Sequence, residues 1–183
     1  MHTKGKILLY SSNLWNFGEG MFGPLLAVYT QRIGGSILDV SWAWAIYLIV
    51  TGVCVIFVGQ YSDRHSKEKI MITGYFITAI CSYSYLLVHT PAHLFILQAV
   101  SGLGLALCNP TWYALYHQYT DVEKAGSGWG LADGQAKIVS GIAIIIGGFV
   151  VNMFSFEALF VVIGSIQLVS TLYQITILRP DHK

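Results

Sequence analysis

The sequence predicts an all-α, polytopic membrane protein that crosses the bilayer with six helices. Of its 183 residues, 55% are hydrophobic and only 10% are charged, whereas soluble domains carry roughly 25% charged residues. In water, a chain this apolar would expose hydrophobic surface on every side. One helical span needs about 20 mostly apolar residues, so a chain of this length accommodates six spans joined by short loops.

Hydropathy and helix-breaking residues predict one transmembrane domain, residues 1–183, with spans at 7–30, 40–61, 70–88, 94–116, 128–151 and 157–178. Pro24 and Pro110 fall inside spans, where neighbouring helices or cavity water can satisfy the freed carbonyl groups. Asn13, Asn16 and Glu19 interrupt the apolar run that a cleaved signal peptide would need, so the first segment is expected to be a retained helix.

The distribution of lysine and arginine predicts the orientation in the membrane. Cytoplasmic loops carry the excess of basic residues. With the N-terminus inside, only Arg32 faces outside, and the cytoplasmic side receives Lys4, Lys6, Arg64, Lys67, Lys69, Lys124, Arg179 and Lys183. We therefore expect an integral protein, in a prokaryotic inner (cytoplasmic) membrane, with both termini in the cytoplasm.

Composition also argues against several functions. Cys54, Cys81 and Cys108 fall in apolar segments, where thiols behave as small hydrophobic groups, so neither a disulfide nor a metal site is expected. A net charge of +1 without a basic patch gives no reason to expect a nucleic-acid partner. All six histidines lie in loops or at span ends, and there is no ATP-binding motif. We predict no catalytic residues, no enzyme activity and no cofactor.

The charged loop between the second and third spans carries the pattern G-x-x-x-D-R-x-x-K, formed by Gly59, Asp63, Arg64 and Lys67. This pattern resembles the loop between the second and third helices of major facilitator superfamily transporters. That family normally has twelve helices in two similar halves. The resemblance therefore implies that the six spans form one such half, built from two inverted three-helix repeats. The alternative is a merely solvated loop that obeys the positive-inside rule.

Two positions depart from the family pattern. Ser66 stands where the family has a second glycine, and Glu68 stands at a usually basic position. In the family, the loop aspartate lies near the N-terminus of the eleventh helix, where the helix dipole favours an anion. By repeat, the eleventh helix corresponds to the fifth. If two copies pair, Asp63 of one copy would meet residues 126–131 of the other, a backbone suited to an anion.

Glycines follow one stripe of the fifth span and recur in the second. Small residues on one stripe let helix backbones approach closely. The resemblance places both helices beside the interface between halves, which predicts a homodimer through these spans. Packing within the six-helix bundle is the alternative. The glycines are Gly52 and Gly59 in the second span, and Gly126, Gly130, Gly134, Gly141 and Gly148 in the fifth.

Ionisable residues within a span are functional candidates. Glu19 shares a helical face with Trp15 and Asn16, and a carboxylate held away from water suits proton binding or substrate contact. Its alternative role is a structural partner of Lys137 or of backbone near Pro24. Asp133 and Lys137 are four residues apart and can pair. Either they form an internal ion pair, or Lys137 faces the cavity and exchanges Asp133 for Glu19.

The fourth span adds Asn109, Trp112 and Tyr113, which suit hydrogen bonding and stacking with a sugar-like or drug-like aromatic solute. Many members of the family have an arginine where this chain has Gln98, so the proton-transfer role of that arginine does not carry over.

The predicted function is secondary transport of a small organic solute by alternating access, in a homodimer of two such halves. Protons are the candidate coupling ion, with symport as one mode. The alternatives are a non-transporting accessory or scaffold subunit, and one half of a heterodimeric transporter. The identity of the solute and the direction of transport do not follow from the sequence.

Overall fold

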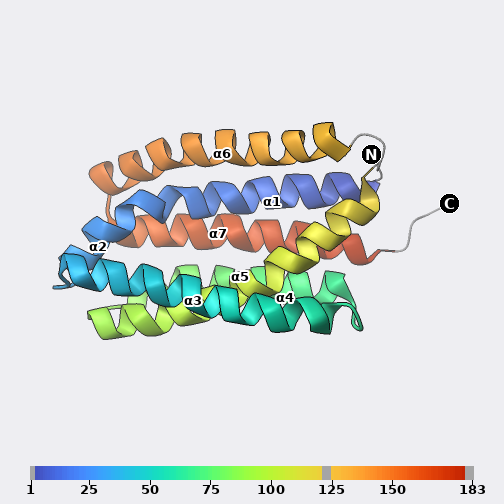
Figure 1. The fold of residues 1–183 in the computed structure, drawn as a ribbon. Helices are drawn as coiled ribbons and strands as arrows, with labels where there is room; N and C mark the ends of the chain where they lie inside the picture. The colour runs from blue at the N-terminus through green and yellow to red at the C-terminus, as the bar shows by residue number, and fades with distance from the viewer. Residues whose placement is uncertain (1–2, 121–124, 180–183) are drawn as a thin grey trace.

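The computed structural model describes residues 3–120 and 125–179, and every regular element in these ranges is helical (Figure 1). Within them the chain forms six long helical segments, three of which include short 3-10 turns. The elements are α1 (Thr3–Phe22), η1 (Gly23–Leu25), α2 (Leu26–Arg32), α3 (Ile37–Ser62), α4 (Lys67–Ser84), η2 (Tyr85–Leu87), α5 (Pro91–Tyr119), α6 (Ala125–Met153), α7 (Phe156–Ile175) and η4 (Thr176–Leu178).

Four helices begin at a serine or threonine whose side chain accepts a hydrogen bond from a backbone N–H in the first turn. Such caps satisfy donors that the helix itself leaves free. Ser36 precedes α3 and forms a capping box with Asp39. Ser66 caps α4, Thr90 caps α5, and Ser155 caps α7. The helices therefore start before the apolar stretches, and α3 begins at residue 37 although the predicted apolar span begins at residue 40.

The two prolines within spans act differently. Pro24 lies in η1, where the chain tightens to a 3-10 turn between α1 and α2. Pro110 lies inside α5, and the helix continues through it to Tyr119. In the loop after α2, Gly34 has φ +82°, a backbone conformation that favours glycine, and the chain reverses there into α3.

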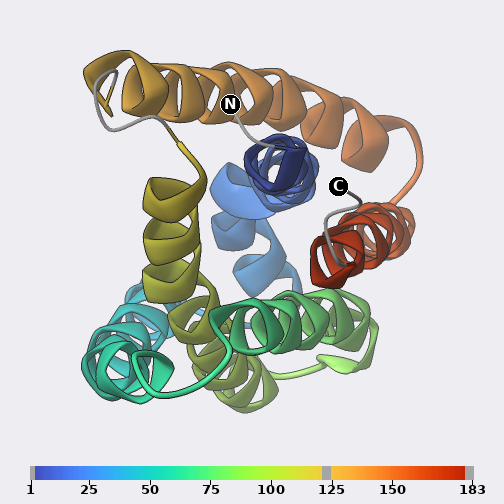
Figure 2. The same cartoon turned by 90° about the vertical axis from the view of Figure 1, so that its right-hand side faces the viewer.

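The helices pack as two related groups of three. The main contacts join α3 with α5, α4 with α5, α1 with α6, α4 with α7, and α1 with α7. The contacts show an internal symmetry in which α1 corresponds to α5, α3 to α6, and α4 to α7. If each helix is replaced by its counterpart, the same five contacts result. The arrangement is that of two repeats forming one half of the predicted fold. In the end-on view, α1 lies between α6 and α7, whereas α3 and α6 lie at opposite edges (Figure 2).

Five helical segments in the described part of the chain are long and apolar enough to cross a membrane, beginning at Ile37, Lys67, Pro91, Gly126 and Phe156. The segment α1–η1–α2 is the exception because polar residues such as Asn13, Asn16 and Glu19 lower its hydropathy. Its place between α6 and α7 explains how the fold tolerates them, since its surroundings are protein more than lipid.

The connections alternate between the two ends of the bundle. The turns after α2, η2 and α6 lie at the left of Figure 1, whereas the 63–66 loop, the start of α6 and the end of η4 lie at the right together with the start of α1. At the left end, Arg32 pairs with Glu157 at 2.9 Å between Nη2 and Oε1. At the right end, the Tyr119 hydroxyl donates to Glu68 Oε1 at 3.2 Å.

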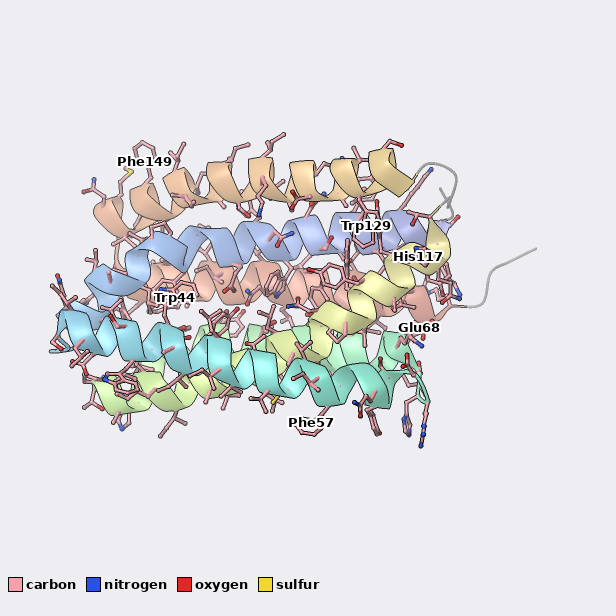
Figure 3. The ribbon with its side chains drawn as sticks, viewed as in Figure 1. Trp44, Phe57, Glu68, His117, Trp129 and Phe149 are labelled. Atoms are coloured by element: carbon pink, nitrogen blue, oxygen red, sulfur yellow. The ribbon has the colours of Figure 1, made fainter. Side chains whose placement is uncertain are left out.

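Two helices bury little of their length. In the most apolar 18-residue stretch of α3 and of α6, only 11% of the residues are buried. In the corresponding stretches of α4 and α7, 44% are buried. Phe57 of α3 and Phe149 of α6 point away from the bundle (Figure 3) and are 66% and 62% exposed. These two helices therefore offer apolar surface to lipid or to another protein.

Candidate functional site

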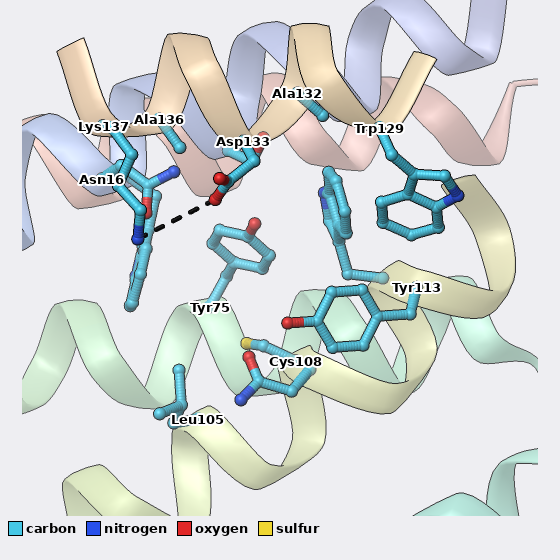
Figure 4. A pocket seen from close by; sticks show the side chains of 14 residues that line it. Asn16, Tyr75, Leu105, Cys108, Tyr113, Trp129, Ala132, Asp133, Ala136 and Lys137 are labelled. Carbon is cyan, nitrogen blue, oxygen red and sulfur yellow. Dashed lines mark ion pairs between the residues drawn. The ribbon is translucent and has the colours of Figure 1, made fainter. Parts of the chain in front are cut away.

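A cavity of about 440 Å³ opens among α1, α4, α5 and α6 (Figure 4). Seven of the eight residues predicted for substrate or proton binding line it: Trp15, Asn16, Asn109, Trp112, Tyr113, Asp133 and Lys137. The eighth, Glu19, does not. Polar groups and aromatic rings share the wall, an arrangement typical of sites for small organic molecules.

Aromatic rings close the cavity toward the end of the bundle where α6 begins. Trp112 stacks on Tyr116 with ring centroids 4.8 Å apart. Trp129 of α6 meets Tyr116 at 5.0 Å and Tyr113 at 5.9 Å. The Tyr116 hydroxyl donates to the Gly128 carbonyl at 2.7 Å. These contacts join α5 to α6 at this end of the cavity.

Asp133 and Lys137 form the predicted ion pair on α6, with Oδ1 and Nζ 3.8 Å apart. In Figure 4 the two side chains project from α6 toward the cavity, and Asn16 lies close to Lys137. Both side chains are mostly exposed, at 74% and 79%, because they face the open cavity. The pair therefore presents a charged, accessible surface to whatever enters.

One polar atom of the cavity wall has no partner within the described residues. The indole Nε1–H of Trp112 is buried, and no hydrogen-bond acceptor lies within reach. By contrast, the Trp15 indole donates to Thr78 Oγ1 at 3.0 Å. A buried donor without an acceptor is destabilising by about 1–3 kcal/mol, so the Trp112 indole can bond an acceptor that the described residues do not supply.

Glu19 lies in a second, smaller chamber, lined among others by Tyr47, Tyr85, Gln98 and Phe160. Trp15 borders both chambers and forms the wall they share. The structural alternative for Glu19 named Lys137 or freed backbone near Pro24 as its partner, and that interpretation is wrong. Gln167 of α7 donates to Glu19 instead, with Nε2 and Oε2 3.3 Å apart. Lys137 lines the other chamber, with Asp133.

The predicted polar face of the fourth span divides into three environments. Asn109, Trp112 and Leu105 line the larger cavity, whereas Gln98 lines the Glu19 chamber and accepts a bond from the Tyr85 hydroxyl at 3.1 Å. Gly102, on the same helix, packs against α3, since a Cβ there would lie 2.7 Å from the Tyr47 carbonyl oxygen. The inclination of α5 across the bundle produces this division.

Sequence reasoning missed a buried polar stripe on α7. Gln167 and Gln174 are 0% exposed, and Ser170 and Thr171 are buried between them. Their spacing of three, four and seven residues marks one face of a helix. The spacing of these polar residues could have been recognised in the sequence, but the stripe contains no charged residue, and only charged residues within spans were considered as candidates.

The charged loop has a local structure that explains one departure from the family pattern. Ser66 caps α4, its hydroxyl accepting from the Lys69 N–H, a role that glycine cannot fill. Asp63 follows the last residue of α3 and pairs with Lys67 at 4.0 Å. The Asp63 side chain remains 78% exposed. Within this chain it is therefore accessible to a partner.

The structure tests one of the two interpretations of the glycine stripes, packing within the six-helix bundle. A Cβ added to Gly52 or Gly59 of α3 would meet no atom within 4 Å of the described structure. The same holds for the fifth-span glycines at 126, 130, 134, 141 and 148. Packing within the six-helix bundle is therefore not their role. The glycines that do pack within the bundle are others, such as Gly147 of α6 and Gly74 of α4.

The fold and cavity define an integral membrane protein whose solute-sized chamber opens among its helices. The family model for the Major Facilitator Superfamily matches residues 9–183. The chain belongs to this family of transporters, which agrees with the expectation that it is not an enzyme.

Named relatives are similar along most of this chain. The multidrug resistance protein MdtL of Klebsiella pneumoniae subsp. pneumoniae is 24% identical over 94% of the chain and 43% of its own length. An uncharacterized MFS-type transporter, MJ1560 of Methanocaldococcus jannaschii, is 23% identical over 80% of the chain and 38% of its own length. The chloramphenicol resistance protein CraA of Acinetobacter baumannii is 22% identical over 84% and 37%. The chain thus spans less than half the length of these relatives.

Proposed function

We propose that this chain forms one half of a secondary transporter that moves a small organic solute by alternating access. The observation that carries this proposal is the convergence of Asn109, Trp112, Asp133 and Lys137 on one open cavity. Charged groups within membrane helices are energetically costly unless they have a function or a partner. A scaffold has no need for a cavity with exposed charges, which disfavours the accessory-subunit alternative.

The solute we propose is drug-like, with an aromatic part and a hydrogen-bond acceptor. Trp112, Tyr113 and Trp129 offer ring faces and edges, and aromatic pairs contribute about 0.5–1.5 kcal/mol beyond area burial. The Trp112 indole offers a free donor. Two relatives are named for multidrug and chloramphenicol resistance, which supports a drug-like solute over a sugar-like one.

A second six-helix bundle must complete the cavity. The faces of α3 and α6 are largely exposed, and a Cβ on the glycines of the two stripes would meet no atom of the described residues within 4 Å. We propose that the second bundle is another copy of the chain, joined through α3 and α6. The exposed Asp63 of each copy would then contact the start of α6 of the other. A different second half, in a heterodimer, is the alternative.

Crosslinking between differently tagged copies tests this assembly. One copy carries Arg64→Cys and the other Gly126→Cys, both exposed and both at the same end of the bundle, in a background without native cysteines. A disulfide between the two tags is expected. The matched control pairs Gly126→Cys with Glu157→Cys, which lies at the opposite end, and should give none. Monomers in nanodiscs, without crosslinks in either pairing, would disprove the homodimer.

Transport itself is tested in proteoliposomes with an imposed pH gradient and with chloramphenicol among a panel of labelled solutes. We propose Glu19 as the proton site, because its carboxylate lines the smaller chamber among the helices and accepts a hydrogen bond from Gln167. The Glu19→Gln variant should lose gradient-driven movement and retain solute exchange. Gradient-driven transport at the wild-type rate in this variant would remove Glu19 from the mechanism.

The direction of movement decides the coupling mode. Resistance, the function in the relatives' names, requires export, and a proton gradient directed inward drives export only by exchange. Accumulation of the solute inside vesicles under an inward-directed proton gradient would indicate symport instead, whereas accumulation under an outward-directed gradient would indicate antiport. The same assay therefore distinguishes antiport from the symport considered from sequence. In either mode we place both termini and the 63–66 loop in the cytoplasm of a prokaryotic inner membrane.

A further inference from the structure

Glu19 is held by a single side-chain amide from another helix. Gln167 Nε2 donates to Glu19 Oε2 at 3.3 Å, and this is the hydrogen bond that the described residues make to the carboxylate. Gln167 is 0% exposed. Its amide therefore has no access to water, and its bonds depend entirely on its protein neighbours.

The orientation of this amide is determined by the Glu19 carboxylate, and Ser82 completes it. Ser82 of α4 donates its hydroxyl to Gln167 Oε1. A carboxylate can only accept hydrogen bonds, so the amide must turn its N–H₂ group toward Glu19 and its carbonyl toward Ser82. The chain Ser82–Gln167–Glu19 thus crosses from α4 through α7 to α1, and each donor along it has an acceptor.

The surroundings of Glu19 contain no competing positive charge. The chamber receives Tyr47 from α3, Cys81 from α4, Tyr85 from η2, and Gln98 and Ser101 from α5. None of these groups is cationic, and the lysine of the neighbouring cavity pairs with Asp133. Among the described residues, the amide of Gln167 is thus the group that donates a hydrogen bond to the Glu19 carboxylate, and such a bond favours the ionised form.

We infer that Gln167 is a positioning residue that holds the Glu19 carboxylate in its ionised form and fixes its direction. This inference rests on the proposed role of Glu19 as the proton site. A hydrogen bond to the charged form favours that form. Proton binding at Glu19 weakens this bond, so protonation of Glu19 loosens the link between α1 and α7.

The test compares Gln167→Met with Gln174→Met. Gln174 is also 0% exposed and lies on the same stripe of α7, but it contacts Ser11 and Met71 instead of Glu19. The readout is the infrared carboxyl band of protonated Glu19, identified by its loss in Glu19→Gln, titrated in reconstituted protein. In Gln167→Met this band should appear at higher pH, by about one unit, because a hydrogen bond to a charged group is lost. Gln174→Met should leave it in place.

The pH profile of transport provides the second readout. In Gln167→Met, the midpoint of this profile should shift in the same direction as the infrared band. In a Glu19→Gln background, the additional Gln167→Met substitution should cause no further change in the transport profile. Equal shifts in both methionine variants, or no shift in Gln167→Met, would overturn the inference. If Gln167→Met fails to fold, Ser82→Ala replaces it, because loss of the Ser82 hydroxyl removes the bond that holds the amide carbonyl in place, and a smaller shift in the same direction is expected. If Glu19→Gln transports like wild type while the band still shifts in Gln167→Met, the proton-site proposal fails and the positioning role stands.

Discussion

Gly147 of α6 lies against the backbone of Met21 in α1, and a Cβ built on Gly147 would be 2.1 Å from the Met21 carbonyl oxygen. Met21 itself is 1% exposed. The neighbouring Gly148 would meet no atom within 4 Å. These adjacent glycines therefore have different structural roles. Gly147 permits close contact within the bundle, whereas Gly148 lies on the exposed face of α6.

The first prediction concerns this pair. Gly147→Ala should destabilise the fold by about 1–3 kcal/mol or more, because the added methyl group forces backbone apart in a packed contact. Gly148→Ala should leave stability unchanged or slightly raised, because alanine favours helix over glycine. Thermal unfolding of the two purified variants in detergent measures the difference. Equal melting temperatures would contradict the close approach of α1 and α6.

The second prediction concerns the Trp112 indole. Trp112→Phe should preserve folding, because the donor it removes has no partner in the described structure, but should weaken solute binding about five- to tenfold if the solute supplies the acceptor. Trp15→Phe is the control, since it removes a donor already bonded to Thr78. Binding of the solute found in the transport screen should therefore change less in Trp15→Phe. The reverse order would rule out the proposed acceptor.

The third prediction separates structural from functional roles of the α6 ion pair. Exposed pairs contribute roughly 0–1 kcal/mol, so Lys137→Met should melt close to wild type while transport falls at least tenfold. The exchanged variant Asp133→Lys/Lys137→Asp keeps the pair and reverses its geometry. If the pair is only structural, the exchanged variant transports normally. We expect it to fail, because the charges face the cavity.

The fourth prediction concerns the open stripe on α6. Gly134→Leu and Gly141→Leu should abolish dimers without unfolding the bundle, since both positions are free within it and bulky side chains prevent close helix approach. Native mass in nanodiscs measures the effect. Ile146→Phe, at a 38% exposed position on a different side of the same helix, is the control and should leave dimers in place. Persistent dimers in both leucine variants would place the interface elsewhere.

Composition and loop spacing were sufficient to predict six helical segments and their alternation, because hydropathy and caps such as Ser36 and Ser155 are local signals. Most of the cavity also followed from polar residues on one helical face, as with Trp15 and Asn16. In these cases the chemistry of a single helix identifies the surface that faces the interior.

What the sequence could not supply was contact between helices. Glu19 and Asn16 lie one turn apart on α1, yet they face different chambers because Trp15 lies between them. Gln167 is 148 residues from Glu19 in the chain, and only tertiary packing brings them together. The roles of Gly147 and Gly148 also differ because of tertiary packing, although both residues are glycine and they are adjacent in the sequence.

The polar residues of α1 have a consequence for how the protein is made. Asn13 bonds Gln135, Glu19 bonds Gln167, and Ser11 bonds Gln174. All three partners come from α6 and α7, which leave the ribosome after the other helices. During synthesis, the Asn13 and Glu19 side chains therefore lack these partners until α6 and α7 are made, whereas the Ser11 hydroxyl can bond the Ile7 carbonyl of its own helix. The stable insertion of α1 is completed by the last part of the chain, which makes assembly of the bundle dependent on sequences far downstream of the segment that begins it.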